Sequence, residues 1–300
     1  MLCAGYHEGA VLRKGWSLVE AVDNPPMIAP DRIAAVVADA MVAKAKKPKG
    51  TMFLLAISAG ALIGLGFVYY VTTQMGASSV EWTGLTKVAG GLAFSVGLGL
   101  VIFTGADLFT STTMSVIPAV RRTISVGTWA SHWAVVYLGN LVGAVGLATL
   151  VFYAGVDSHG GGAFGSVVLS TAVAKMSHSW LEAFLLGVLA NFLVCLAVWV
   201  SFAARTVAGK VIAITGPISL FVATGFEHSV ANMFMIPLGI MVGSRADAAS
   251  LRELGINLDQ LTVTGFITDN LIPVTAGNIV GGSVLVALFY WLVYLKKQEG

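Results

Sequence analysis

"TGFEHSVANMFMIP", from Thr224 to Pro237, sets an acid and a histidine side by side inside an otherwise apolar stretch. A second segment, "TGADLFTSTTMSVIP" from Thr104 to Pro118, follows the same plan. Both open with Thr-Gly, carry an acid two residues after the glycine and close with Ile-Pro. "GNLVGA" (139–144) and "GNIVGG" (277–282) echo each other in the same order. Two ordered echoes indicate that the chain contains an internal repeat.

The composition excludes an ordinary soluble domain. Of the 300 residues, 57% are hydrophobic and 11% are charged, whereas a typical soluble domain is about 25% charged. A membrane-spanning helix needs about 20 apolar residues. Five uncharged runs meet or approach that length: Thr51–Val80, Val88–Ala106, Thr123–Val156, Ala183–Ala204 and Asn270–Leu295. The chain is therefore predicted to be an all-α, multi-pass membrane protein.

The apolar runs predict six transmembrane spans, at 51–73, 86–118, 128–154, 179–203, 209–241 and 263–295. Positive charge marks the cytoplasmic side of such a protein. Ten basic residues would fall on one side: Lys44, Lys46, Lys47, Lys49, Arg121, Arg122, Arg205, Lys210, Lys296 and Lys297. Both termini are therefore predicted to be cytoplasmic, in a bacterial-type inner (plasma) membrane.

Each half of the repeat holds three spans. Because three is odd, the second half must enter the membrane upside down, which gives an inverted 3+3 repeat with its site near the midplane. The second and fifth spans are rich in glycine and contain proline, which frees backbone groups from the helix. Lipid tolerates this only inside protein or beside water. We expect both spans to be interrupted, with breaks that meet at the centre.

The chain is expected to have three parts. Residues 1–50 form a cytoplasmic segment in which Asp31 to Lys47 has the pattern of an amphipathic helix, with Ile33, Val37 and Met41 on one stripe. Residues 51–295 form the transmembrane domain, and 296–300 form a cytoplasmic tail. The helix is expected to lie against the bundle or the headgroups, with a regulatory plug as the alternative.

Polar residues at membrane depth are candidate site residues, because a charge at mid-helix costs about 2.5–3.5 kcal/mol. Asp107 and Glu227 are expected to be neutral or capped by backbone donors at the helix breaks. His228 is expected to face the lumen and Glu227 to point away from it, because neighbours on a helix lie about 100° apart. Imidazole can give an anion a proton or a hydrogen bond. The alternative is a buried histidine that bonds a neighbouring helix.

Amides and large apolar residues surround these groups. Hydrogen bonds between helices are the default role of Asn140, Asn191, Asn232 and Asn278, with Asn232 lining the path as an alternative. Five apolar residues flank the breaks, where they either pack or form constrictions that exclude hydrated ions: Phe94, Leu98, Leu108, Phe109 and Phe221.

Several long sequence motifs resemble those of the formate–nitrite transporter family, most closely those of its formate channels, over roughly residues 50–296. They are "GGLAFSVGL", "GADLFTS", "LGNLVGA", "LANFLVCLAVW", "GFEHSVANMFMIP" and "GFITDNLIPVTAGN". The resemblance implies an aquaporin-like fold, a homopentamer and one pore in each protomer. It implies that His228 is the central pore histidine, with Thr110 as its hydrogen-bonding partner and Asn278 beside them. It implies that the five flanking residues form constrictions and that Lys175 attracts anions in the outer vestibule.

We therefore expect a bidirectional channel or proton-linked transporter for small monovalent anions, formate first, in the lipid bilayer. The alternatives are a nitrite or hydrosulfide channel of the same family and an aquaporin-like pore for neutral solutes, although Asn-Pro-Ala boxes are absent. Enzyme activity, a cofactor and a metal are not expected, because Glu227 and His228 lack the H-E-x-x-H spacing of a metal hydrolase. No basic aromatic patch suggests nucleic acid.

Overall fold

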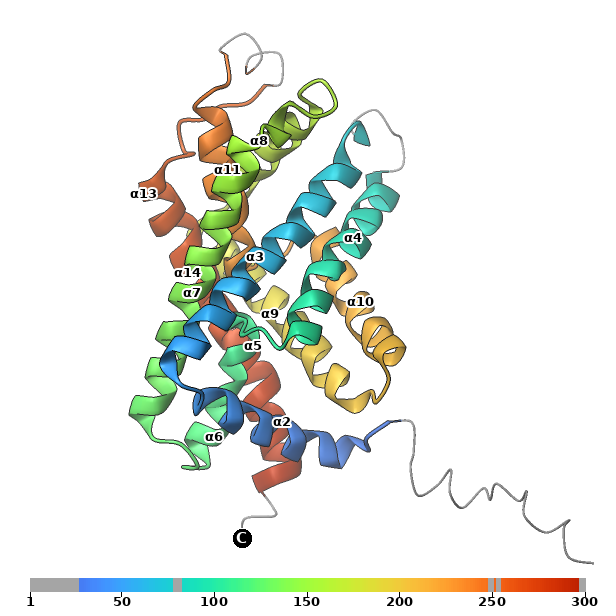
Figure 1. Cartoon of the computed structure of the whole chain (residues 1–300), viewed down its shortest axis with the longest axis vertical. Coiled ribbons are helices and arrows are strands. Elements are labelled where there is room, and N and C mark those ends of the chain that lie inside the picture. The colour runs from blue at the N-terminus through green and yellow to red at the C-terminus, as the bar shows by residue number, and fades with distance from the viewer. Residues whose placement is uncertain (1–26, 78–82, 248–250, 252–254, 297–300) are drawn as a thin grey trace, which may run out of the picture.

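A computed structural model describes residues 27–77, 83–247, 251 and 255–296, and within them the molecule is built from helices (Figure 1). Five described helical segments are long and apolar enough to cross a membrane: α3 (Lys49–Gln74), α4 (Thr83–Thr104), α7 (Val126–Tyr153), α9 (Trp180–Ala203) and the continuous segment Val263–Leu295. The last contains α13 (Val263–Gly265), η4 (Phe266–Leu271), α14 (Ile272–Ile279), η5 (Val280–Leu288) and η6 (Trp291–Leu295).

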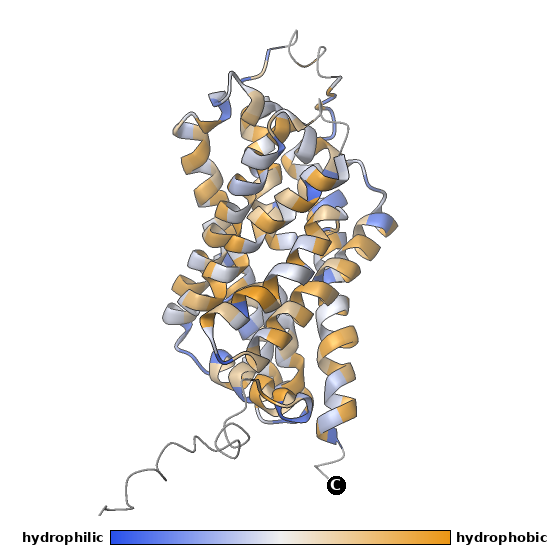
Figure 2. Cartoon of the chain, turned by 90° about the vertical axis from the view of Figure 1, so that its right-hand side faces the viewer, coloured by the Kyte–Doolittle hydropathy of each residue, from blue (hydrophilic) through white to orange (hydrophobic). Residues whose placement is uncertain are grey.

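Shorter helices complete the bundle. They are α2 (Pro30–Ala45), α5 (Phe109–Thr112), η2 (Thr113–Ser115), α6 (Val116–Val120), η3 (Val156–Ser158), α8 (Ala163–Met176), α10 (Val207–Ala223) and α11 (Ser229–Gly243). Large apolar side chains lie on the outside, since Ile212 and Leu150 are 75% and 70% exposed. Figure 2 shows hydrophobic residues distributed along the helices. Such an exterior suits lipid rather than water.

Two helices stop and resume inside the bundle, as the sequence predicts. α4 ends at Thr104 and α5 begins at Phe109, while α10 ends at Ala223 and α11 begins at Ser229. Each first half ends in a Schellman motif whose glycine has positive φ, Gly105 at 69° and Gly225 at 75°. The hydrogen bonds of the two motifs also match. In the first, the N–H of Gly105 donates to Ile102 O and that of Ala106 donates to Val101 O. In the second, the N–H of Gly225 donates to Val222 O and that of Phe226 donates to Phe221 O.

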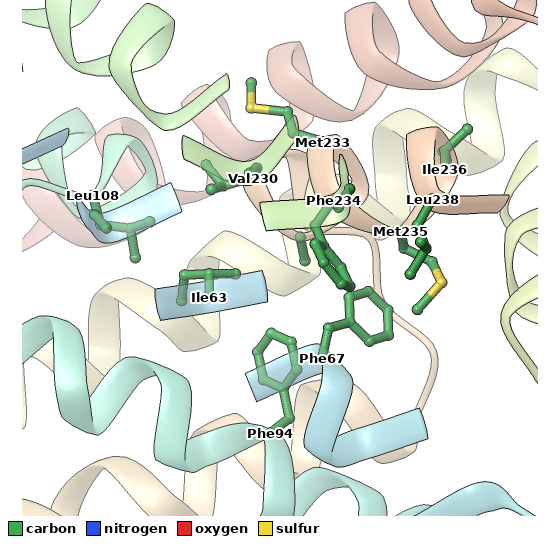
Figure 3. Close-up of a cluster of buried hydrophobic side chains, with 14 of the residues drawn as sticks. Ile63, Phe67, Phe94, Leu108, Val230, Met233, Phe234, Met235, Ile236 and Leu238 are labelled. Atoms are coloured by element: carbon green, nitrogen blue, oxygen red, sulfur yellow. The ribbon is translucent and has the colours of Figure 1, made fainter. Parts of the chain in front are cut away.

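Glycines allow the helices to approach closely. A Cβ added at Gly143 of α7 would overlap the carbonyl group of Ile57 on α3, and one at Gly281 would overlap the carbonyl oxygen of Val188 on α9. The larger gaps are filled by aromatic rings. Phe67 contacts Phe94 edge to face with ring centroids 5.5 Å apart, and Phe234 packs on its other side at 6.3 Å (Figure 3).

The amphipathic helix predicted before the first span is α2, and it packs against the bundle. Pro30 begins it, where a missing N–H costs nothing. Its buried stripe, with Ile33, Val37 and Met41, belongs to one apolar cluster with Trp199 of α9 and residues of α6 and η5. Residues 1–26 and 297–300, which complete the predicted N-terminal segment and tail, lie outside the described residues.

Helix α8 lies within residues 155–178, between the third and fourth predicted spans, where the sequence predicts no membrane span. Its 14 residues are too few to span a bilayer. It nonetheless buries an apolar face that includes Phe164, Val168 and Ala172, and it packs against α11. It carries Lys175 in its last turn, so this lysine belongs to a helix rather than to a loop.

Replacement of Gly143 by alanine is expected to destabilise the protein, because the new methyl group would meet backbone atoms of α3 that cannot rotate away. Overpacking of this kind costs about 1–3 kcal/mol. Gly146→Ala is the matched control, since a Cβ there would meet no atom within 4 Å in the protomer. The melting temperature in detergent should fall for Gly143→Ala alone. Equal melting temperatures would contradict the tight α3–α7 contact.

Candidate functional site

A cavity of about 510 Å³ lies among α4, α8, α10 and the break before α11. Its wall mixes aromatic, hydroxyl and charged side chains: Phe67, Tyr70, Lys87, Phe94, Ser170, Thr171, Lys175, Ser177, His178, Phe221, Thr224, Glu227 and His228. Of the sequence-predicted site residues, Lys175, Phe94, Phe221, Glu227 and His228 therefore meet around one space. The cavity carries two lysines against one carboxylate, that of Glu227, so its excess charge is positive and suits a small anion better than a cation.

His228 closes the break and begins α11. Its backbone is extended, with φ −116° and ψ 115°, and its Nδ1 accepts a hydrogen bond of 3.1 Å from the N–H of Ala231. Its Nε2 lies 2.9 Å from Oγ1 of Thr110, which comes from the other break. Because Nδ1 is the acceptor, the neutral ring carries its proton on Nε2 and donates it to Thr110. The sequence prediction that pairs His228 with Thr110 agrees with this geometry.

Glu227 and His228 do not lie on one helix, which corrects the argument that helix geometry turns them apart. Both belong to the extended segment before α11, and both line the cavity. The spacing of residues along a helix therefore does not apply to them. The two side chains are separated instead by their partners, since His228 bonds Thr110 and Glu227 bonds Lys175.

The apolar residues predicted as constrictions fall into two groups. Phe94 and Phe221 line the cavity with their rings edge to face at 5.6 Å, and Phe221 stacks on the His228 ring at 6.0 Å. Leu98 and Leu108 are 2% and 0% exposed in the same core cluster and are not in the described lining of the cavity. Phe109 packs instead on two aromatic rings of α7: Trp133 and Tyr137.

Two asparagines hold the two breaks by the same set of bonds. Asn140 accepts from the N–H of Phe109 at 2.8 Å and donates to the carbonyls of Ala56 and Asp107. Asn278 accepts from the N–H of Ser229 at 2.9 Å and donates to the carbonyls of Gly187 and Glu227. Asn278, predicted at the pore centre, thus lies behind the break with its amide fully used. The two repeated Gly-Asn motifs, at 139–144 and 277–282, supply these two amides.

Both buried acids bind lysines, whereas the sequence interpretation made them neutral or capped by backbone donors. Asp107, 0% exposed, lies 2.7 Å from Lys47 and 3.3 Å from Lys44. Glu227 lies 2.8 Å from Lys175. An uncompensated charge at this depth would be costly, and each carboxylate has an ammonium group as its partner. Lys44 and Lys47 were missed because sequence gives no link between them and an acid 60 residues further along.

Further side-chain amides contact Glu227 and the peptide of Thr110. Asn232 donates to Glu227 at 2.6 Å and to Oδ1 of Asn270, so it bonds across helices rather than lining the path. Asn191 donates to the Thr110 carbonyl at 3.1 Å, and Cys195 Sγ lies 3.3 Å from the same oxygen. These contacts fix the peptide that carries the Thr110 hydroxyl.

The charge balance of the cavity differs from the sequence prediction. The ammonium group of Lys175 is matched by Glu227, and His178 also lies 3.9 Å from that carboxylate. Lys87 lines the same cavity, is exposed and has no ion-pair partner among the described residues. The unbalanced positive charge is therefore that of Lys87, which the sequence did not single out as a site residue.

Comparison with known proteins agrees with this geometry. A family model described as "Formate/nitrite transporter" matches residues 31–292. The formate channel FocA of Escherichia coli (strain K12) is 44% identical over 281 residues, which is 92% of this chain and 98% of that protein. The formate channel BtFdhC of Bacillus thuringiensis is 32% identical over 271 residues, 90% of this chain and 97% of that protein.

Solved structures are similar as well. A pentameric formate channel with formate bound has a TM-score of 0.75 and 43% identity, covering 83% of this chain and 98% of that one. An ion channel of the FNT family has a TM-score of 0.70 and 32% identity, covering 88% and 98%. With a family model over most of its length and relatives at this identity, the chain belongs to the formate/nitrite transporter family.

Proposed function

We propose that this chain forms a channel for small monovalent anions, with formate as its first substrate. The observation that carries the proposal is a cavity whose wall combines a free lysine with a histidine that presents an N–H. The names of the relatives favour formate over nitrite or hydrosulfide. The lining has donors and positive charge but little to hold a cation, which argues against a general neutral-solute pore.

The architecture that best fits is six spans in an inverted 3+3 repeat, aquaporin-like, in the inner (plasma) membrane. α10 and the resumed α11 would make one interrupted crossing, and α4 with α5 to α6 the other. The matching Schellman motifs and the matching bonds of Asn140 and Asn278 support this repeat. α2 and the C-terminal end of the last span lie at one end of the molecule (Figure 1), as expected if both termini are cytoplasmic. One pore in each protomer of a homopentamer follows the pentameric relative.

An anion would first be drawn into the cavity by charge. Lys175 is balanced by Glu227, so the pair offers a dipole, whereas Lys87 offers an uncompensated charge. A cleft with low-dielectric walls focuses such a field. Phe94 and Phe221 would then strip water from the anion as it approaches the imidazole.

His228 would act by donating a hydrogen bond, from its neutral form. A neutral ring that gave up its Nε2 proton would become an imidazolate, so it cannot protonate formate outright. An imidazolium could, but its second proton would sit on Nδ1 and displace the N–H of Ala231. We therefore infer that any proton that crosses with the anion comes from hydronium in the solvent, which reverts to water, and that His228 and Thr110 orient the anion that receives it. Leu98 and Leu108 would form the apolar barrier that favours the neutral acid.

Formate uptake should follow an inward proton gradient in liposomes that contain the purified protein. The neutral acid loses far less hydration free energy than the anion in an apolar constriction, so dissipating the gradient should slow uptake. Nitrite, acetate and lactate assayed beside formate rank the substrates. Rapid water permeation without formate movement would reject the anion channel in favour of a neutral-solute pore.

Replacement of Thr110 by valine should slow formate flux, because it removes the hydroxyl that bonds His228 Nε2. A hydrogen bond between neutral groups contributes about 0.5–1.5 kcal/mol, so flux should fall roughly 2- to 10-fold. Thr110→Ser retains the hydroxyl and should keep most of the flux. Initial rates in proteoliposomes, normalised to folded protein, measure both. If valine and serine variants transported equally, the hydroxyl would have no part in permeation.

Replacement of Lys87 by methionine should lower the initial rate of formate entry at low ionic strength and leave it unchanged at high ionic strength. One exposed charge is worth about 1 kcal/mol at 4 Å in water, which corresponds to a two- to fivefold effect, and salt screens it. Lys210→Met, which removes a lysine outside the cavity, is the control. A salt-independent loss in Lys87→Met would indicate a structural role instead.

A further inference from the structure

A second hollow, of about 510 Å³, lies between the C-terminal end of α2, the start of α3 and the start of α7. Its described lining is polar and basic: Lys46, Lys47, Lys49, Ser125, Thr128 and Ser131, with Ala45 and Gly127. In Figure 1 these helix ends lie together at the end of the molecule that holds α2 and the C-terminus, away from α8. Nothing in the permeation mechanism uses this hollow.

The charge of the hollow is positive and only partly balanced. Its lining has three lysines and no acid. Lys47 is held by Asp107, and Lys49 donates to Oγ of Ser131. Lys46 is exposed and has no partner among the described residues. The ammonium groups of Lys46 and Lys49 therefore lie at the hollow without a carboxylate partner. The two positive charges repel each other, and a bound anion would relieve that repulsion.

Neutral donors surround these charges. The hydroxyls of Ser125 and Thr128 bond each other at 3.0 Å, and Ser125 also caps the N–H of Thr128. Val126 and Gly127 are the first two residues of α7, whose N–H groups have no acceptor within the helix. The ammonium groups, these hydroxyls and the N–H of Gly127 thus belong to residues that line one hollow, and groups of these kinds bind phosphate oxygens.

We propose that this hollow binds the phosphate group of an anionic phospholipid. The lipid source is favoured over free phosphate by the surroundings. Val126, beside the hollow, is 71% exposed and apolar. Trp129 and Trp133, one and two turns further into the span, meet edge to face with ring centroids 4.6 Å apart. Apolar side chains and tryptophans mark the level at which headgroups meet acyl chains. Basic pockets between helix ends at that level bind anionic headgroups.

The site is tested by thermal unfolding of the purified full-length protein in detergent, titrated with phosphatidylglycerol. Phosphatidylcholine and inorganic phosphate are titrated in parallel. The test variant is Lys46→Ala/Lys49→Ala, and the control is Arg32→Ala/Lys210→Ala, which removes the same charge outside the hollow. Each lysine near a headgroup contributes about 1 kcal/mol, so the test variant should bind phosphatidylglycerol about 30-fold more weakly. Lys46→Glu, at an exposed position, serves if the double variant does not fold.

Protection by phosphatidylglycerol that the test variant loses and the control keeps would support the proposal. Equal, lysine-dependent protection by inorganic phosphate would support the oxyanion site but overturn the lipid as its source. Equal protection of both variants, or protection by phosphatidylcholine as strong as that by phosphatidylglycerol, would overturn the site itself. The readout does not depend on formate flux, so this result and the failure of the proposed channel activity are distinguishable.

Discussion

Backbone polar groups exposed where two helices break inside an apolar bundle must find partners within the protein, and the rest of the structure depends on how they do. Asn140 and Asn278 each satisfy one N–H and two carbonyls at a break. A buried group left unpaired costs about 1–3 kcal/mol. The glycine before each asparagine lets its helix come close enough, since a Cβ at Gly139 or Gly277 would collide with α3 or α9. The two Gly-Asn dipeptides thus stabilise the helix breaks.

Two equivalent breaks carry different chemistry. Each has a buried acid bound to lysine, and in both cases the lysine comes from outside the long spans: from the connection after α2 for Asp107 and from α8 for Glu227. The next residue differs, being Leu108 after Asp107 and His228 after Glu227. A symmetric scaffold therefore supports one polar group at the centre and an apolar residue at the matching position, which is the combination that a selective constriction needs.

Much of this could be predicted from sequence because it depends on local pattern. Uncharged runs predicted the long helices, and the glycine and proline content of the second and fifth spans predicted their interruptions, which fall at Gly105 and Gly225. α8 was missed because a 14-residue apolar helix gives no spanning signal. The lysine partners and the full use of the Asn278 amide could not be predicted, since they depend on contacts between residues far apart in sequence. The prediction that Glu227 and His228 point apart was wrong because it assumed a helix, whereas the backbone at the break is extended.

In the proposed channel, the position of His228 would join helix capping and permeation in one ring. Nδ1 caps α11, which fixes the tautomer, and the fixed tautomer leaves an N–H on Nε2 beside Thr110. A neutral donor in apolar surroundings attracts an anion without binding it as an ion pair would, and a permeating ion must be able to leave as well as enter. A lysine at this position would hold the anion too strongly, and an apolar residue would not admit it. The capped imidazole lies between these extremes because the helix end, rather than solvent, determines where its proton resides.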